Sequence, residues 1–188
     1  MVTKLNLLAL VLFLYPASQA QISGGYWSTG CINGLKKEQV YGNNNKVIST
    51  ESFYQDADCK VESFRFQTIG LVSYYQNSPE FIDFVYQEIY LSVFKQNVIE
   101  DLNLRKVCGY SDWTKAGAQN ITGLKCTLFN INKPTQIPAA GDLKYGIFLV
   151  EKTKLYYGQL SPDFDGSTPA KRPGKINSLI EYIFQNSP

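Results

Sequence analysis

The sequence predicts a mainly β fold, an antiparallel β-barrel that carries one short helix and two disulfides. Alternating apolar and polar segments, separated by Gly, Asn and Pro turns, run through most of the chain, as is typical of antiparallel strands. Two of these segments, 61–75 and 81–94, are long for a sandwich and suit a strongly coiled barrel whose edges are closed or covered. The start at Gly25-Tyr26-Trp27 is typical of a first barrel strand whose tryptophan closes one barrel end.

The amino-terminal segment has the pattern of a secretory signal. Lys4 gives a positive start, Leu7–Tyr15 is an apolar run shorter than the ~20 residues of a membrane-spanning helix, and Ser18-Gln19-Ala20 supplies small residues for cleavage. We predict a signal peptide over residues 1–20 and one domain over residues 21–188, with an uncleaved anchor as the alternative. The mature chain has no second apolar stretch of membrane length, so we expect a protein secreted to the periplasm or the extracellular space, without a transmembrane segment.

The first part of the mature chain predicts three strands. The first is Tyr26–Cys31, and the next two, Lys37–Tyr41 and Val47–Tyr54, flank Gly42–Asn45. Gly and Asn tolerate positive φ, so this tetrapeptide predicts a hairpin turn. The polar segment 55–58 predicts a further turn.

Two long strands follow, and they carry most of the candidate binding residues. In Val61–Tyr75, Phe64 and Phe66 alternate with polar residues, and Gly70 indicates a bulge or a sharp bend. In Phe81–Phe94 both faces are largely apolar, which is typical of a strand buried on both sides or of one between a core and a cavity.

The rest of the chain mixes helix and strand signals. Lys95–Leu104 has helical spacing and predicts a short helix over a barrel end, and Leu179–Phe184 suggests a second short helix. Gly123–Ile131 and Tyr145–Glu151 predict strands, and Lys154–Leu160 is expected to form a hairpin with the latter.

Charge and residue content exclude several functions. Once Lys4 is removed, 17 basic residues stand against 16 acidic ones without a basic block, so the charge does not indicate nucleic acid as a partner. The chain has no histidine, which excludes Ser-His-Asp and Cys-His catalysis and histidine-based metal sites. We expect no catalytic residue, no metal and no cofactor.

Four cysteines in an exported chain predict two disulfides, for which three pairings are possible. The pairing Cys31–Cys59 with Cys108–Cys126 is favoured because each bond closes a local loop. A four-cysteine metal site is the alternative, although no pair has the close Cys-x-x-Cys spacing that such sites usually show.

Several spaced motifs, read together, resemble one known family. In chain order they are Gly25-Tyr26-Trp27-Ser28 with Cys31, then Tyr54, Asp56 and Cys59, then Leu102-Asn103, Cys108-Gly109 and Trp113, then Asn120-Ile121-Thr122 before Cys126, and finally Leu155-Tyr156-Tyr157-Gly158-Gln159 with Lys171-Arg172-Pro173. The chain resembles the domain of the adenomatosis polyposis coli down-regulated family, whose animal members are extracellular Wnt antagonists. The resemblance implies a non-enzymatic, lipocalin-like, partly open β-barrel with an apolar cavity for a lipid tail. Animal members resemble two such domains with a membrane anchor, whereas this chain has one domain, which puts a Wnt-specific role in doubt.

The aromatic residues of the two long strands are the candidate ligand site. Their rings would supply apolar walls and the tyrosine hydroxyls hydrogen bonds, and a carboxylate among them would meet a polar head group or stay protonated. The alternative for each is plain core packing, or a solvated carboxylate for Glu88. The candidates are Phe64, Phe66, Tyr74, Phe84, Tyr86, Glu88 and Tyr90.

Other polar and aromatic motifs have mainly structural interpretations. Trp27 is expected to close the barrel and Trp113 to pack on its neighbouring disulfide. The segment 163–167 resembles part of a calcium loop but lacks the closing Glu, so an Asx-type turn is favoured, with Arg172 pairing to one of its aspartates. Asn120 is a glycosylation acceptor if the host is eukaryotic.

We therefore expect a secreted binding protein, without catalysis, that holds a lipid or other apolar small molecule in a barrel cavity. The main alternative is an interaction module with a filled core that binds an extracellular protein or a glycan through its outer surface. A third hypothesis is a small hydrolase that uses Asp163 and Asp165 with Asp142 or Glu151, because such chemistry needs two carboxylates across a cleft.

Overall fold

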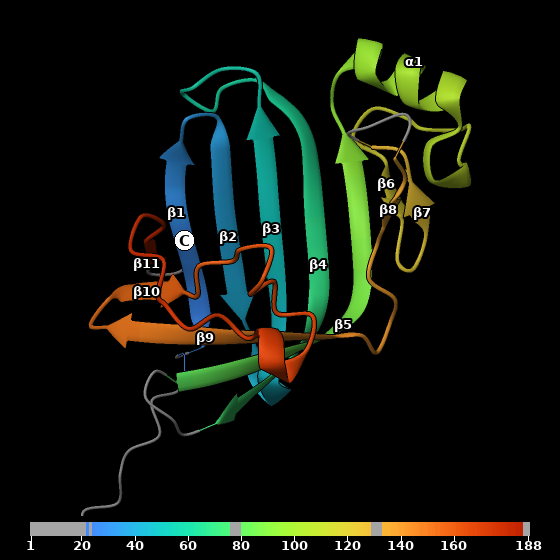
Figure 1. Ribbon diagram of the computed structural model, residues 1–188. Coiled ribbons are helices and arrows are strands. Elements are labelled where there is room, and N and C mark those ends of the chain that lie inside the picture. Colours follow the sequence, from blue (N-terminus) through green and yellow to red (C-terminus); the bar gives the residue numbers. More distant parts are fainter. Residues whose placement is uncertain (1–21, 23, 76–79, 129–132, 186–188) are drawn as a thin grey trace, which may run out of the picture.

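The computed structural model describes residues 22, 24–75, 80–128 and 133–185 (Figure 1). The main sheet contains β1 (Gly25–Ile32), β2 (Leu35–Tyr41), β3 (Lys46–Tyr54), β4 (Glu62–Tyr75), β5 (Glu80–Val93), β6 (Ala118–Asn120), β9 (Leu143–Glu151), β10 (Lys154–Tyr157) and β11 (Tyr182–Gln185). The other elements are α1 (Gln96–Arg105), β7 (Lys125–Cys126), β8 (Thr135–Gln136) and the short turns η1 (Asn43–Asn45), η2 (Val107–Gly109) and η3 (Pro169–Lys171). The signal peptide predicted over residues 1–20 lies outside the described residues.

The described strands confirm the predicted antiparallel barrel. Eight strands follow one another in the order β4-β3-β2-β1-β11-β10-β9-β5, and β5 pairs back along β4. This last ladder closes the ring, whereas the family resemblance implied a partly open barrel. In Figure 1, β9 and the first half of β5 run across the direction of β1–β4, so the barrel is strongly coiled.

The predicted amino-terminal strands and their hairpin are confirmed. β2 and β3 pair from Leu35↔Phe53 to Tyr41↔Val47, and η1 forms the turn between them. Asn44 and Asn45 both have positive φ there, which explains why asparagines occupy this turn. The meander then continues from β3 into β4.

A β-bulge divides β5 into two halves with opposite alternation. Gly70 pairs with Tyr86 and Ile69 pairs with Glu88, so Gln87 is an extra residue on β5. Gly70 is required on the facing strand, because an added Cβ would lie 2.3 Å from the backbone oxygen of Val85. The bend predicted at Gly70 is therefore confirmed, and it moves the inward side of β5 from even to odd positions.

The carboxy-terminal strands confirm one prediction and correct two. β9 and β10 form the expected hairpin, but β10 ends at Tyr157 rather than at Leu160. The helix suggested over Leu179–Phe184 is wrong, because Tyr182–Gln185 form β11 between β1 and β10. Long-range pairing of Phe184 with Trp27 decides the conformation of this short segment.

The helix and the irregular segment lie beside the barrel end. α1 confirms the predicted helix and lies beside the end of β5 (Figure 1). Its buried residues Ile99 and Leu102 belong to the same hydrophobic cluster as residues of β5 and of the segment after the helix. The strand predicted over Gly123–Ile131 is wrong in its described part, where only Lys125–Cys126 form a strand. Its remainder, 129–131, lies outside the described residues. In the described part of the chain, no helix has the length and apolar character needed to cross a membrane.

Both favoured disulfides are confirmed. Cys31 bonds Cys59 across 28 residues, and Cys108 bonds Cys126 across 18 residues. The first ties β1 to the turn after β3, and the second holds the segment after α1 against β7. Trp113 lies in the same buried cluster as the second disulfide.

Two hydrophobic clusters fill opposite parts of the described interior. The barrel core contains Ile22, Trp27, Tyr41, Val47, Val72, Ile82, Phe148, Leu155 and Tyr182. The helix-side core contains Ile89, Leu91, Val93, Ile99, Leu102, Val107, Cys108, Trp113, Ile121, Cys126 and Ile137. Trp27 is 1% exposed and packs edge-on against Phe184, with ring centroids 5.1 Å apart. Trp27, which was expected to close one barrel end, is thus buried in the barrel core.

The segment 159–174, called the strap below, is fastened to the barrel by Arg172. The Arg172 guanidinium lies 2.6 Å from a carboxylate oxygen of Asp83 on β5 and also donates to the carbonyl of Gly146 on β9. Its charge faces the ring of Phe81, 4.2 Å from the centroid. The expected pairing of Arg172 with an aspartate of its own segment is therefore wrong, and the nearby pair there is Lys171–Asp165, at 3.8 Å.

Candidate functional site

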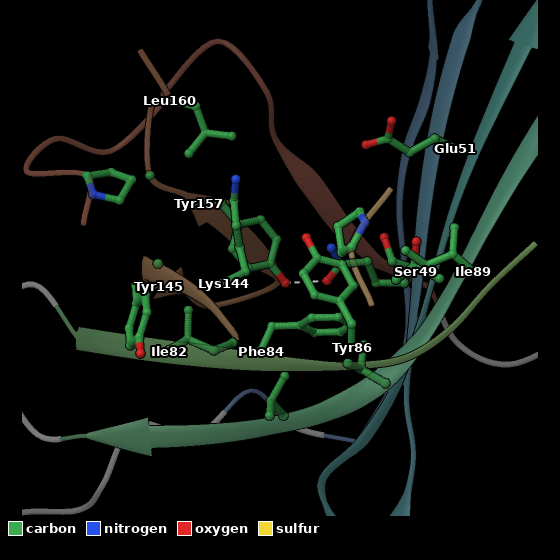
Figure 2. Close-up of a pocket in the computed structure, with 18 of the residues that line it drawn as sticks. Ser49, Glu51, Ile82, Phe84, Tyr86, Ile89, Lys144, Tyr145, Tyr157 and Leu160 are labelled. Atoms are coloured by element: carbon green, nitrogen blue, oxygen red, sulfur yellow. Dashed lines mark hydrogen bonds between the residues drawn. The ribbon is translucent and has the colours of Figure 1, made fainter. Parts of the chain in front are cut away.

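An open cavity of about 430 Å³ lies inside the barrel, where the barrel core and the helix-side core leave space between them (Figure 2). β2, β3, β4, β5, β9 and the strap all contribute to its wall. Residues that line it are Gln39, Tyr41, Val47, Ser49, Glu51, Phe66, Thr68, Val72, Ile82, Phe84, Tyr86, Ile89, Ile137, Pro138, Lys144, Tyr145, Gly146, Ile147, Tyr157, Gly158, Leu160 and Pro173. Such a volume falls in the range of small-molecule sites.

Strand alternation and the bulge place the apolar wall. On β4, Phe66 and Val72 lie on the inward face, at even positions. On β5, Phe84 and Tyr86 face inward before the bulge and Ile89 faces inward after it. Figure 2 shows Ile82, Phe84 and Tyr86 side by side along one wall.

The structure brings three of the predicted site residues to this cavity. Phe66, Phe84 and Tyr86 line it, while Phe64 and Tyr74 lie on the same face of β4 but pack elsewhere. Phe64 stacks on Phe53, with ring centroids 4.6 Å apart, in the direction of the helix-side core. Tyr74 packs edge-on against Phe148 in the barrel core.

The other two predicted residues lie outside the cavity because of the bulge. Glu88 and Tyr90 follow Gln87, so their even positions face outward rather than inward. Glu88 is exposed, and the Tyr90 hydroxyl donates to its carboxylate at 3.2 Å. One extra residue reverses the alternation of all later residues of the strand, and the bulge at Gln87 was not predicted from the sequence.

Three polar groups meet at one side of the cavity. The Tyr41 hydroxyl donates to the side-chain oxygen of Gln39 at 2.8 Å, and the Tyr157 hydroxyl contacts both of them. Burial raises the pKa of Tyr41 and of Tyr157 well above the ordinary tyrosine value. The Gln39 side-chain oxygen thus accepts from both hydroxyls, and this contact joins β2 to β10 across the interior.

Two charged side chains line the cavity in the described residues, and they lie on different walls. The Glu51 carboxylate on β3 accepts a hydrogen bond from Lys37 of β2 at 2.7 Å. Lys144 on β9 donates to the backbone carbonyl of Asp165 in the strap. Burial lowers the pKa of Lys144, although the Asp165 charge acts in the opposite direction. Figure 2 shows Lys144 and Leu160 on one side and Glu51 on the other.

Most of the cavity wall outside β4 and β5 was not predicted from the sequence. Gln39, Ser49 and Glu51 come from a hairpin whose alternation is visible in the sequence, so β2 and β3 also had a detectable inward face. Gly158 and Pro173 belong to the terminal motifs. A Cβ added to Gly158 would lie 2.6 Å from the Pro173 ring, so a glycine lets the strap approach the barrel.

The remaining candidate motifs lie away from the cavity lining. Asp165 accepts a hydrogen bond from the backbone of Ser167 at 2.9 Å, which confirms the Asx-type turn. Asp142 accepts one from the backbone of Ala139 at 2.8 Å. Neither these aspartates nor Asp163 and Glu151 line the cavity. In the described ranges, no three His, Cys, Asp or Glu side chains are grouped closely enough to hold a metal ion.

A second cavity, of about 410 Å³, lies at the β2–β3 turn. It is lined by Ile22, Gly24, Tyr41, Gly42, Asn43, Asn44, Asn45 and Tyr74. Tyr41 lines both cavities and therefore lies between them. Glycine and asparagine residues make up most of the lining of this second cavity, beside Tyr41 and Tyr74.

The fold and the site define an eight-stranded antiparallel β-barrel with an internal, largely apolar cavity. Comparison with models of known protein families gives no match, and a search of curated proteins finds none with significant similarity.

Proposed function

We propose that this protein is a non-enzymatic, secreted binding protein that holds a lipid or other apolar small molecule in the barrel cavity. The observation that carries the proposal is the cavity itself, about 430 Å³ of space between two packed cores. Leaving such a space empty sacrifices packing, since close-packed interiors are the rule in folded proteins. A bound apolar molecule would restore those contacts.

The composition of the wall supports an apolar ligand. Rings of Phe66, Phe84 and Tyr86 offer broad apolar surfaces, and burial of ligand surface stabilises a complex by about 25 cal/mol per Å² before association costs. Two of the tyrosine hydroxyls, on Tyr41 and Tyr157, already have partners. The polar groups would therefore orient a ligand rather than supply most of its affinity.

Other observations support an extracellular setting. Both disulfides are typical of oxidising compartments, and the pattern in residues 1–20 is that of a secretory signal. The resemblance to the adenomatosis polyposis coli down-regulated domain points in the same direction and rests on the ordered motifs alone. The alternative of an interaction module predicts a filled interior, so the cavity favours a ligand-binding function.

Paired substitutions on β3 test the proposal. Ser49 lines the cavity, whereas its neighbour Thr50 lies on the opposite face of the same strand. We expect Ser49→Phe to weaken binding of a fluorescent fatty-acid probe by tenfold or more, because the ring occupies the cavity. Thr50→Phe is the matched control and should bind the probe as the unaltered chain does.

Native mass spectrometry gives an independent measurement. Protein purified from its source should carry a co-purifying lipid that disappears in Ser49→Phe. A chain that is repeatedly ligand-free and binds no fatty acid or fluorescent lipid probe would contradict the proposal.

A further inference from the structure

Lys144 is the positively charged side chain among the described residues that line the cavity, and its charge is incompletely satisfied there. Its ammonium donates to the Asp165 carbonyl, and in the described part of the chain no carboxylate lies within ion-pair distance of it. The Asp165 carboxylate lies within ion-pair distance of Lys171, at 3.8 Å, and its charge acts on Lys144 only from farther away. An ammonium has three donors, so Lys144 retains the capacity to bind another acceptor.

The opposite wall of the cavity carries a carboxylate, Glu51, and has no free cation for an anion to contact among the described lining residues. Glu51 carries the negative charge of the cavity wall, and Lys37 already offsets it at 2.7 Å. An incoming anion would therefore be attracted to Lys144, and the paired Glu51 offers it no favourable contact. Figure 2 places these two residues on different sides of the cavity.

We propose that the ligand is an anionic amphiphile, whose carboxylate or phosphate head contacts Lys144 while its hydrocarbon body lies along Phe84 and Tyr86. This inference rests on the proposed function and names the chemical class of its ligand. A charge-assisted hydrogen bond from the ammonium to an anionic oxygen is stronger than the present bond to a neutral carbonyl.

Lys144 is also partly withdrawn from water. The side chain is half-buried, and removal from water lowers the pKa of its amine, which means that the charged form lacks full compensation. A bound anion would supply that compensation at the point where the strap meets β9. Neutral lipids would leave the amine as it is.

Four ligands of equal chain length test this inference: lauric acid, dodecyl phosphate, dodecanol and dodecylamine. Affinities are measured by calorimetry on the oxidised chain, below the concentrations at which each ligand forms micelles. We expect both anions to bind roughly tenfold or more tightly than dodecanol, since a hydrogen bond to a charged group contributes about one to two powers of ten in affinity. Dodecylamine should bind more weakly than the anions.

Variants then assign the preference to one side chain. Lys144→Met should remove the preference for the anions over dodecanol, while Lys144→Arg should retain the preference. Lys154→Met is the matched control, because Lys154 is an exposed lysine that pairs with Glu181 at 2.9 Å and does not line the cavity. Thermal unfolding checks that each variant is folded.

The outcomes separate this inference from the function on which it rests. Equal binding of lauric acid and dodecanol, tightest binding of dodecylamine, or an anion preference that survives in Lys144→Met would each overturn the inference while the cavity remains a ligand site. Failure of all four ligands to bind would overturn the proposed function, and this inference with it.

Discussion

At the residue scale, Arg172 is the side chain that connects the strap to the barrel most directly. It joins Asp83 of β5 in an ion pair whose side chains are each 11% exposed, and it also donates to a carbonyl of β9. Because both charges are largely removed from water, loss of one partner leaves the other uncompensated. The sequence indicated neither the pairing of Arg172 with Asp83 nor the burial of the pair, because the aspartates of the strap are much closer to Arg172 along the chain.

We predict that Arg172→Met lowers the free energy of unfolding by roughly 3 kcal/mol. Urea unfolding measures the effect, and Arg172→Met combined with Asp83→Asn should recover part of the loss because the buried carboxylate is then absent. Lys171→Met is the control, since the exposed Lys171–Asp165 pair should contribute less than about 1 kcal/mol. Equal losses in the two single variants would contradict this assignment.

The buried tyrosines Tyr41 and Tyr157 predict a loss of stability at alkaline pH. Burial raises their pKa in the folded chain, so both stay protonated where an unfolded tyrosine has ionised. Their contribution is therefore complete below the ordinary tyrosine pKa of about 10 and decreases as the pH rises above it.

Unfolding measured from neutral pH to about pH 12 checks the sign. The double variant Tyr41→Phe with Tyr157→Phe should show a shallower alkaline decrease in the free energy of unfolding than the unaltered chain. The exposed Tyr75 provides a control, and Tyr75→Phe should leave the slope unchanged. A slope unaffected by the double variant would count against this explanation.

At the element scale, the bulge between β4 and β5 determines which side chains enter the cavity. Gln87 is the extra residue, and it reverses the inward positions of β5 between Tyr86 and Ile89. Gly70 permits the close approach on the facing strand. The glycine was recognisable in the sequence, but the residue of β5 that it faces depends on the register of two strands.

We predict that Gly70→Ala destabilises the barrel by about 1–3 kcal/mol, because the methyl group meets the Val85 backbone and the Phe84 ring. Ligand binding should weaken as well, since Phe84 lines the cavity. Gly174→Ala is the matched control, because nothing lies within 4 Å of an added Cβ there. Equal stability of the two variants in chemical unfolding would contradict the close contact at Gly70.

Two of the motifs on which the family resemblance rests make hydrogen bonds that hold local structure in place. Asp56 accepts hydrogen bonds from the backbone of Lys60 and Val61, and these bonds lower its pKa and hold the turn that carries Cys59. Asn103 of α1 exchanges two hydrogen bonds with the backbone of Trp113, at 2.7 and 3.0 Å. Asp56 thus stabilises a turn, and Asn103 fixes α1 to the segment that follows it.

At the scale of the whole molecule, the two disulfides differ in their exposure to solvent. Cys31 is exposed at the end of β1, whereas Cys126 is fully buried and Cys108 is 9% exposed in the helix-side core. The chain-entropy model gives about 3–4 kcal/mol for each loop. The side chains of Cys108 and Cys126 also stabilise the fold by packing in the helix-side core.

We predict that a mild reductant opens Cys31–Cys59 first and leaves Cys108–Cys126 intact until the fold is lost. Alkylation of the freed thiols followed by peptide mass spectrometry gives the order. Replacing Cys108 and Cys126 with Ala should destabilise the chain more than replacing Cys31 and Cys59, because it also creates a cavity. Reduction of the buried bond first would contradict this prediction.

The sequence by itself determined the class of fold, the long strands, the helix after β5 and the two disulfides, because alternation, turn residues and cysteine spacing are local properties of the chain. Three of its candidate residues line the cavity, namely Phe66 on β4 and Phe84 and Tyr86, which precede the bulge on β5. Only the tertiary structure decided that the barrel closes along β4 and β5, that Tyr182–Gln185 form a strand, and that Lys144 lies in the cavity wall. Those features depend on strand register and on contacts between distant segments, and neither can be predicted from local sequence patterns.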